Sequence, residues 1–388
     1  MSATLMEFLN KVGLSSKVNG FALSFGKSIE FNDRSLFNLP PLIPDWDYDT
    51  ICSSYLDNKS YHLDEFKQAG YKTMIAQDAG VGVAFYKKCL GFKRLEADHI
   101  WSLFWAQAER CRQKVCVSIY IVCRPFPLRI AKSKSLKRTF ENSCSERHLE
   151  MLEYLQKFME SYSGIPKIAQ LWLTELAHNS MKNLYHADEQ FLDFFERNKE
   201  KLKDAFVFLM GDHGPRTDGI ESVPLGRCET NNPLLIVTVP ERYRNKEIHN
   251  EIRKKAYQLM TPFDLHATLM DIVKLQPQKD FSDVSYRNMQ PLSKGSSLLR
   301  EWRGERNCRN LSIAPQYCLC HYDKTTVSDE DLKEKLGRFL VEHLNKELEG
   351  AGLNSMCYEQ EYDFEIAGPI NACYYGALGS ATAAQQAK

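Results

Sequence analysis

Hydrophobic and polar positions along the chain follow two different periods, which predict helices and strands in turn. Apolar residues spaced three or four apart predict helices over residues 61–69, 145–162, 188–202 and 329–348. Short apolar runs predict strands at residues 71–76, 115–122, 165–174, 205–210 and 234–239. Strands that alternate with helices are typical of an α/β fold with a mostly parallel central sheet flanked by helices.

Two of these segments carry sharper signals. The run from Ala205 to Met210 is apolar throughout, which predicts a strand buried on both faces. Thr261 and Pro262 open a predicted helix, because threonine is a good N-cap and proline fits the first helical position.

The composition becomes polar and rich in Ser and Arg near residues 275–310. We therefore expect an α/β core over residues 1–275 and a small Cys-containing C-terminal subdomain over residues 276–388. The small-residue tail that begins at Ala377 is expected to fray.

The N-terminal segment predicts an amphipathic helix. Phe8, Leu9 and Leu14 lie at helical spacing, with Glu7 and Lys11 between them. A signal peptide would instead show a basic region followed by an apolar region. Two interpretations stay open: an intracellular protein, or a chain that starts inside a longer parent.

Composition and charge narrow the functional classes. The 388 residues suffice for one large domain or two medium ones with a sizeable core. The chain has 50 Lys and Arg against 50 Asp and Glu, and zero net charge argues against nucleic acid as the main partner. No apolar run approaches the ~18 residues of a membrane span.

The twelve cysteines are spread along the whole chain, and two glycosylation sequons begin at Asn58 and Asn310. In an oxidising compartment the cysteines would form up to six disulfides, whereas in the cytosol most would be buried thiols. Cys318-Leu319-Cys320 has no clustered histidines beside it, so a structural zinc site is the less favoured alternative.

The strongest candidate for chemistry is Gly211-Asp212-His213-Gly214, directly after the apolar strand. Ligands in open α/β sheets bind outside the carboxyl ends of the strands, and glycines allow close backbone approach. Asp212 and His213 are a natural pair of ligands for Zn²⁺ or Mn²⁺. Arg216 offers a bidentate fork for an anionic substrate group. The alternative is an ordinary loop whose Asp caps a helix.

His178 follows a second apolar strand and is therefore expected at the same edge of the sheet. A histidine there can protonate a leaving group or bind an anionic oxygen. The alternative is a loop histidine that makes an ordinary hydrogen bond. We expect structural roles for His266, within a packing helix, and for the pair Asp98-His99.

These segments resemble the sulfatase-like branch of the alkaline phosphatase superfamily. Within this branch the chain is most similar to the family named domain of unknown function 229, over roughly residues 1–375. The matching segments are Gly70–Thr73 with Asp78, Thr174–Asn179, Phe206–Gly214, Gly226, Glu229 and Pro233–Ile236, Thr261–Asp271, Arg306–Cys308 and Tyr317–Cys320.

The resemblance implies a metal-dependent hydrolase or transferase of phosphate or sulfate esters. In that pattern a hydroxyl nucleophile attacks the ester at a divalent cation, here Zn, Mn, Ca or Mg. Asp212 and His213 match the late metal ligands, and His178 matches the histidine for substrate or leaving group. The segment Arg34–Leu42 matches the nucleophile segment and places Ser35 at the nucleophile.

Two departures from the family pattern limit this expectation. The family's early metal-binding Asp belongs to a first strand that would precede the segment matching Met1, and this chain has no such strand. We therefore expect a metal site without its first carboxylate, and Asp78 is the first replacement to consider. The formylglycine signature around Ser35 is also absent, which argues against classical sulfatase activity.

Three interpretations of the function follow. The first is an esterase or transferase acting on an anionic ester, with catalysis impaired by the missing Asp. The second is a non-catalytic secreted or lumenal binding protein with a degenerate sulfatase-like fold. The third is an incomplete product of an active parent. The resemblance to the family's Cys-rich C-terminal segment favours disulfides. It therefore also favours an extracellular or secretory-lumen location for the full-length parent. Truncation would then explain the absent signal peptide.

Overall fold

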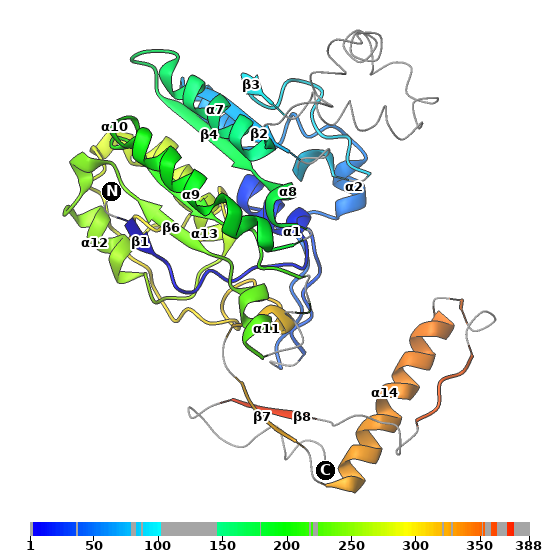
Figure 1. The fold of residues 1–388 in the computed structure, drawn as a ribbon. Coiled ribbons are helices and arrows are strands. Elements are labelled where there is room, and N and C mark those ends of the chain that lie inside the picture. Colours follow the sequence, from blue (N-terminus) through cyan, green and yellow to red (C-terminus); the bar gives the residue numbers. More distant parts are fainter. Residues whose placement is uncertain are drawn as a thin grey trace, which may run out of the picture. The chain divides into compact units, whose positions relative to one another are not determined.

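The computed structural model describes residues 3–35, 38–78, 83–86, 88–101, 146–178, 180–216, 219, 224–319, 322–326, 329–350, 352–353, 358–362 and 371–375. The chain divides into two compact units, Met1–Leu319 and Cys320–Lys388. Figure 1 shows their elements.

The first unit alternates strands and helices, as the sequence predicts. Its strands are β1 (Ala3–Leu5), β2 (Lys72–Gln77), β3 (His99–Ile100), β4 (Lys167–Trp172), β5 (Val207–Met210) and β6 (Leu235–Thr238). Its helices are α1 (Ser16–Phe25), α2 (Tyr48–Cys52), α3 (His62–Gln68), α7 (Arg147–Glu160), α8 (Thr174–Ala177), α9 (Lys182–Arg197), α10 (Lys199–Leu202), α11 (Pro224–Asn231), α12 (Glu247–Lys254) and α13 (Pro262–Met270). A π-helical turn, η5 (Asp271–Leu275), continues α13.

Strand pairing divides the described strands of this unit between two three-stranded sheets. β2 pairs in parallel with both β3 and β4, so that Met74 lies opposite His99 on one side and Ala169 on the other. β6 pairs antiparallel with β1 and β5, with Val237 opposite Phe208. The α/β class is confirmed, but among the described strands parallel pairing occurs only around β2. The apolar pattern of a strand does not reveal the direction of its neighbour, which is why the sequence did not distinguish the two sheets.

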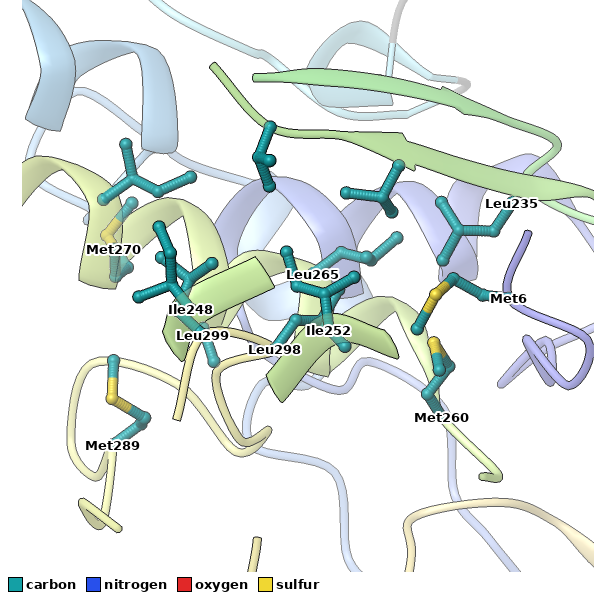
Figure 2. Close-up of a cluster of buried hydrophobic side chains, with 14 of the residues drawn as sticks. Met6, Leu235, Ile248, Ile252, Met260, Leu265, Met270, Met289, Leu298 and Leu299 are labelled. Atoms are coloured by element: carbon teal, nitrogen blue, oxygen red, sulfur yellow. The ribbon is translucent and has the colours of Figure 1, made fainter. Parts of the chain in front are cut away.

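The main hydrophobic core brings β6 together with α12, α13 and a segment near residue 298. Figure 2 shows its side chains pointing toward one another from these elements. Its buried members include Met6, Leu235, Ile248, Ile252, Met260, Leu265, Met270, Met289, Leu298 and Leu299. A smaller cluster of Met74, Ala76, Met151 and Phe158 packs α7 against β2.

Residues beyond 275 complete this core. Leu298 and Leu299 are fully buried in it. The buried Arg300 guanidinium forms ion pairs with Asp271 at 2.9 Å and with Asp283 at 2.8 Å. Residues 276–319 therefore pack into the first unit, which ends at Leu319. The predicted domain boundary after residue 275 implies that residues 1–275 fold independently of the rest, and this stays a prediction.

The N-terminal segment is not the amphipathic helix that its spacing predicts. Residues 3–5 form β1, and the backbone of residues 8–10 then pairs with Met260: the Met260 N–H donates to the Phe8 carbonyl, and the Asn10 N–H donates to the Met260 carbonyl. Leu9 is buried, whereas Phe8 and Leu14 are exposed. Pairing with β6 and Met260 satisfies these backbone groups in an extended form, so tertiary partners override the local helical spacing.

Most other predicted elements are confirmed, with their ends shifted by a few residues. α13 begins as expected, because Thr261 and Asp264 form a reciprocal capping box. β5 is less buried than predicted, since it is an edge strand and its Leu209 is 36% exposed. The strand predicted at 115–122 and the tail from Ala377 lie outside the described residues.

Disulfides join Cys52 to Cys89 and Cys308 to Cys318. Among the described residues, Cys228 is a free thiol. Disulfides persist in oxidising compartments and are rare in the cytosol, which favours a non-cytoplasmic location.

The second unit contains an antiparallel pair of strands, β7 (Tyr322–Thr326) and β8 (Asn371–Tyr375), and the helix α14 (Glu330–Gly350). α14 confirms the helix predicted over residues 329–348. The Asn345 side chain exchanges hydrogen bonds with the Gln360 backbone at 2.9 Å each, which ties the returning chain to α14.

Candidate functional site

The loop after β5 holds Asp212 and His213 in place by backbone hydrogen bonds. The Gly211 N–H donates to the Leu234 carbonyl at 2.9 Å, and the Gly214 N–H donates to the Thr230 carbonyl at 3.0 Å. A Cβ at position 214 would lie 1.9 Å from the Glu229 carbonyl oxygen, so only glycine fits there. The two glycines therefore let the loop pack tightly against α11 and the start of β6.

His213 has a defined tautomer in this loop. Its Nδ1 lies 2.7 Å from the Gly214 carbonyl oxygen, which only accepts hydrogen bonds, so Nδ1 carries the proton. Nε2 of the neutral ring then presents a lone pair. It lies 3.3 Å from the Ser16 hydroxyl and 3.7 Å from Oδ2 of Asp212.

Asp212 contributes an oxygen that the described protein leaves unsatisfied. Its Oδ2 is buried and has no hydrogen-bond partner among the described residues. A buried carboxylate oxygen without a partner is costly. One hard oxygen and one imidazole nitrogen, 3.7 Å apart, are ligand types that fit a divalent cation such as Zn²⁺ or Mn²⁺.

The pair supplies fewer protein ligands than the three that are usual in catalytic zinc sites. Within the described ranges there is no group of three or more His, Cys, Asp and Glu side chains that could hold a metal ion. Asp78, the predicted replacement carboxylate, is buried, and its Oδ1 accepts from the Thr174 N–H at 2.7 Å. That bond caps the first turn of α8 and gives Asp78 a structural task.

Ser16 is the residue that sequence reasoning missed. It is the first residue of α1, and the chain before it is held by Asn19, whose Oδ1 accepts from the Val12 and Gly13 N–H groups at 2.8 and 3.2 Å. The only local signal was Ser15-Ser16 before an apolar helix, which is typical of any helix start. Its contact with His213 joins positions 197 apart in sequence and depends on tertiary packing.

Ser35, the predicted nucleophile, lies on an exposed turn. Its hydroxyl donates to Asp33 Oδ2 at 3.1 Å, and its backbone N–H donates to Asp33 Oδ1 at 2.8 Å. The hydrogen bonds described for Ser35 thus lie within its own turn. Its role as nucleophile stays a prediction.

His178 and Arg216 occupy the ends of two loops. His178 is exposed and follows the last residue of α8, the short helix after β4. Among the described strands β4 and β5 belong to different sheets, so the shared sheet edge expected for His178 and Asp212 is not found. Arg216 is half-buried and follows Pro215, whose carbonyl accepts from the Thr230 hydroxyl at 2.7 Å. The structure brings Asp212 and His213 together with Ser16, and the roles predicted for His178 and Arg216 stay predictions.

The histidines expected to have structural roles contact other parts of the fold. His266 is buried inside α13 against Gly26 of α1. Asp98 accepts hydrogen bonds from the Thr73 backbone and hydroxyl at 3.1 Å each, and His99 contacts the Tyr162 hydroxyl at 2.8 Å. These contacts tie elements of the fold together.

Comparison with known proteins gave one family and a remote structural likeness. A family model described as "Protein of unknown function (DUF229)" matches residues 1–365. No curated protein sequence matches the chain. Among solved structures, the chain is similar to the C-terminal periplasmic domain of EcEptC from Escherichia coli in complex with Zn, with a TM-score of 0.43 and 10% identity. That match covers 81% of this chain and 79% of the other. Since the family model spans nearly the whole chain, the protein belongs to the family of unknown function DUF229.

Proposed function

We propose that this protein is a metal-dependent hydrolase or transferase of phosphate or sulfate esters, of the sulfatase-like type within the alkaline phosphatase superfamily. The observation that carries the proposal is the convergence of Asp212 Oδ2, His213 Nε2 and the Ser16 hydroxyl. It occurs in the Gly-Asp-His-Gly segment that resembles the metal-binding segment of that superfamily.

Asp212 and His213 would hold the cation, which when bound polarises an ester oxygen and stabilises its negative charge. Zn, Mn, Ca and Mg are the candidates, and the nitrogen ligand favours Zn or Mn. The hydrogen bond from Nδ1 to Gly214 keeps the ring oriented with Nε2 toward Asp212. Such outer hydrogen bonds normally fix the tautomer of a metal-binding histidine.

The remaining roles follow from the resemblance. The Ser35 oxygen would attack the phosphorus or sulfur atom and pass its hydroxyl proton to Asp33, whose Oδ2 accepts from it at 3.1 Å. The bond from that atom to the leaving oxygen would break, and water or an acceptor hydroxyl would then release the group from Ser35. His178 would give its proton to the leaving oxygen, and Arg216 would hold the anionic group through its fork. Ser16 lies beside the same lone pair: when a cation occupies Nε2, the Ser16 hydroxyl can no longer donate to it, and its oxygen would face the cation instead.

The test measures metal binding and ester turnover separately. Full-length chain is loaded with Zn²⁺, Mn²⁺, Ca²⁺ or Mg²⁺ and assayed on aryl phosphate, phosphodiester and aryl sulfate. We expect Asp212→Asn and His213→Ala each to lose bound metal by elemental analysis and to lose turnover on the order of 100-fold or more.

His186→Ala is the matched control, because His186 is an exposed histidine that pairs with Glu146 at 2.6 Å on the surface. It should keep both metal and turnover. Equal metal content in wild type, Asp212→Asn and His213→Ala would show that this pair is not a metal site.

A non-catalytic binding protein is the second candidate. It is favoured by the two-residue ligand set, since no third His, Cys, Asp or Glu joins it in the described part of the chain. In that case the purified chain would hold no stoichiometric metal and would turn over none of the esters. We place the protein in the extracellular space or the secretory lumen, supported by its disulfides. Among the described helices, none combines the length and the apolar character that crossing a membrane requires.

A further inference from the structure

We propose that Asn58 carries an asparagine-linked glycan and that Tyr55 supports its first sugar. Asn58 begins the sequon Asn58-Lys59-Ser60, and asparagine in such a sequon is the acceptor for glycosylation in secreted chains. Its side chain is exposed at the tip of a turn.

The turn is held rigidly although its tip is exposed. The Lys59 N–H donates to the Leu56 carbonyl at 2.9 Å, which closes the turn around Asp57 and Asn58. The Asp57 carboxylate accepts from the Lys93 and Arg94 N–H groups at 2.8 and 2.9 Å.

The stretch just before this turn is cross-linked to the segment near residue 91. The Leu56 N–H donates to the Gly91 carbonyl at 2.8 Å, and the Cys52–Cys89 disulfide joins the two segments a few residues away. A disulfide forms in the same oxidising compartment in which asparagine is glycosylated. The turn therefore presents Asn58 outward from a fixed base.

An open surface depression surrounds Asn58, lined by Tyr55, Asp57, Asn58, Lys93 and Arg94. Tyr55 is 47% exposed and lies three residues before the acceptor. An exposed aromatic ring offers apolar area to the C–H face of a sugar while its hydroxyl stays in water. Asp57 and the two basic side chains offer hydrogen bonds to sugar hydroxyls at the rim.

The modification needs a lipid-linked oligosaccharide diphosphate as co-reactant. The bond from Asn58 Nδ2 to C1 of the first sugar forms, and the bond from C1 to the diphosphate oxygen breaks. One amide proton is lost to the solvent, and the lipid diphosphate leaves.

Asn310, in the second sequon, has a different setting. Its Nδ2 donates to the Glu305 carbonyl at 3.2 Å, and its backbone N–H donates to Asn307 Oδ1 at 3.1 Å. Asn310→Gln therefore serves as the control that removes a sequon without touching the Asn58 turn.

The test uses the full chain behind a heterologous secretion leader, translated in the presence of microsomes. We expect Asn58→Gln to lose one glycan in a gel-shift assay, and Ser60→Ala to lose the same glycan. Ser60→Thr, which preserves the sequon, should keep it, and Asn310→Gln should leave it in place. Treatment in ¹⁸O-water with an enzyme that hydrolyses the amide bond between the asparagine and the glycan should convert residue 58 to labelled Asp in the wild type. If residue 58 stays unlabelled and Asn58→Gln migrates as the wild type, Asn58 is not an acceptor.

The role of Tyr55 is measured by thermal unfolding before and after removal of the glycan. We expect deglycosylation to lower the melting temperature of the wild type and to change that of Tyr55→Ala less. Equal shifts in both proteins would show that the sugar does not pack on this ring.

Discussion

At the scale of single residues, the candidate metal site depends on the orientation of His213. The Gly214 carbonyl takes the Nδ1 proton, so that Nε2 points to Asp212 and to the Ser16 hydroxyl. Without that bond either tautomer would be available and the ring could rotate. The residues before and after this histidine therefore determine its chemistry as much as the histidine itself.

We expect the loss of the Ser35 hydroxyl to change ester turnover, and the loss of the Ser16 hydroxyl to change metal affinity. Ser35→Ala should lose ester turnover on the order of 100-fold or more while keeping bound metal, since a nucleophile is needed for the reaction and not for binding. Ser16→Ala should lower metal affinity by about 10- to 100-fold, because it removes the hydroxyl oxygen that would face the cation beside Nε2. Both are measured by titration with metal followed by turnover at saturating metal.

Ser24→Ala is a useful comparison, because it removes another buried hydroxyl of α1, away from the helix start. It should leave metal affinity unchanged. The reverse result, with turnover lost in Ser16→Ala and kept in Ser35→Ala, would make Ser16 the nucleophile and remove Ser35 from the site.

At the scale of elements, the packing of α1, α3 and α13 encloses two histidines. Burial lowers the pKa of His62 to about 4 and the pKa of His266 to about 3. Among the described residues, both ring nitrogens of His266 are without a hydrogen-bond partner. Gly26 of α1 leaves the room that this ring needs, because a Cβ there would lie 2.4 Å from its Nδ1.

The stability of the fold is expected to fall as the pH drops below about 6.5. Both histidines stay neutral in the folded chain and take up protons when it unfolds, so the unfolded chain binds more protons in this range. Each contributes stability that is present above pH 6.5 and is lost at up to about 1.4 kcal/mol per pH unit below it. Urea unfolding at pH 7.5, 6.5 and 5.5 measures this dependence.

One buried carboxyl acts in the opposite direction. Burial raises the pKa of Glu96 to about 7, so this group stabilises the fold at low pH and loses that contribution as the pH rises. The two histidines outweigh it. His266→Gln should reduce the pH dependence and Glu96→Gln should steepen it, each compared with the wild type at the same three pH values. If the unfolding free energy changes with pH equally in wild type, His266→Gln and His62→Gln, this account is contradicted.

At the scale of the whole molecule, residues 276–319 determine where the first unit can be cut. Removing them takes Leu298, Leu299 and Ile313 out of the buried interior. It also leaves the fully buried Asp271 without Arg300, and an uncompensated buried charge costs about 3–5 kcal/mol. That loss is a large part of the net stability of a domain.

A chain that ends at Leu319 is therefore expected to unfold cooperatively in a thermal scan, and a chain that ends at Leu275 is not. Both are produced with the same N-terminus, and circular dichroism follows the transition. Cooperative unfolding of the shorter chain would support the domain boundary that the sequence pattern predicts.

Local signals in the sequence determined several parts of this protein. Apolar spacing predicted α3, β2, α7, β4 and α14, because their side chains repeat with the period of the element. The Thr261-Pro262 start of α13 and the glycines around Asp212 and His213 were also visible, since caps and tight turns depend on neighbouring residues.

Only the tertiary structure decided the rest. The N-terminal residues pair with β6 and Met260 instead of forming a helix, and the apolar runs separate into one parallel and one antiparallel sheet. Ser16 meets His213 across the fold, while Ser35, the serine that the motif points to, bonds within its own turn. A pattern reports the period of an element, whereas pairing and proximity depend on partners that are distant in sequence and are chosen by packing and backbone hydrogen bonding.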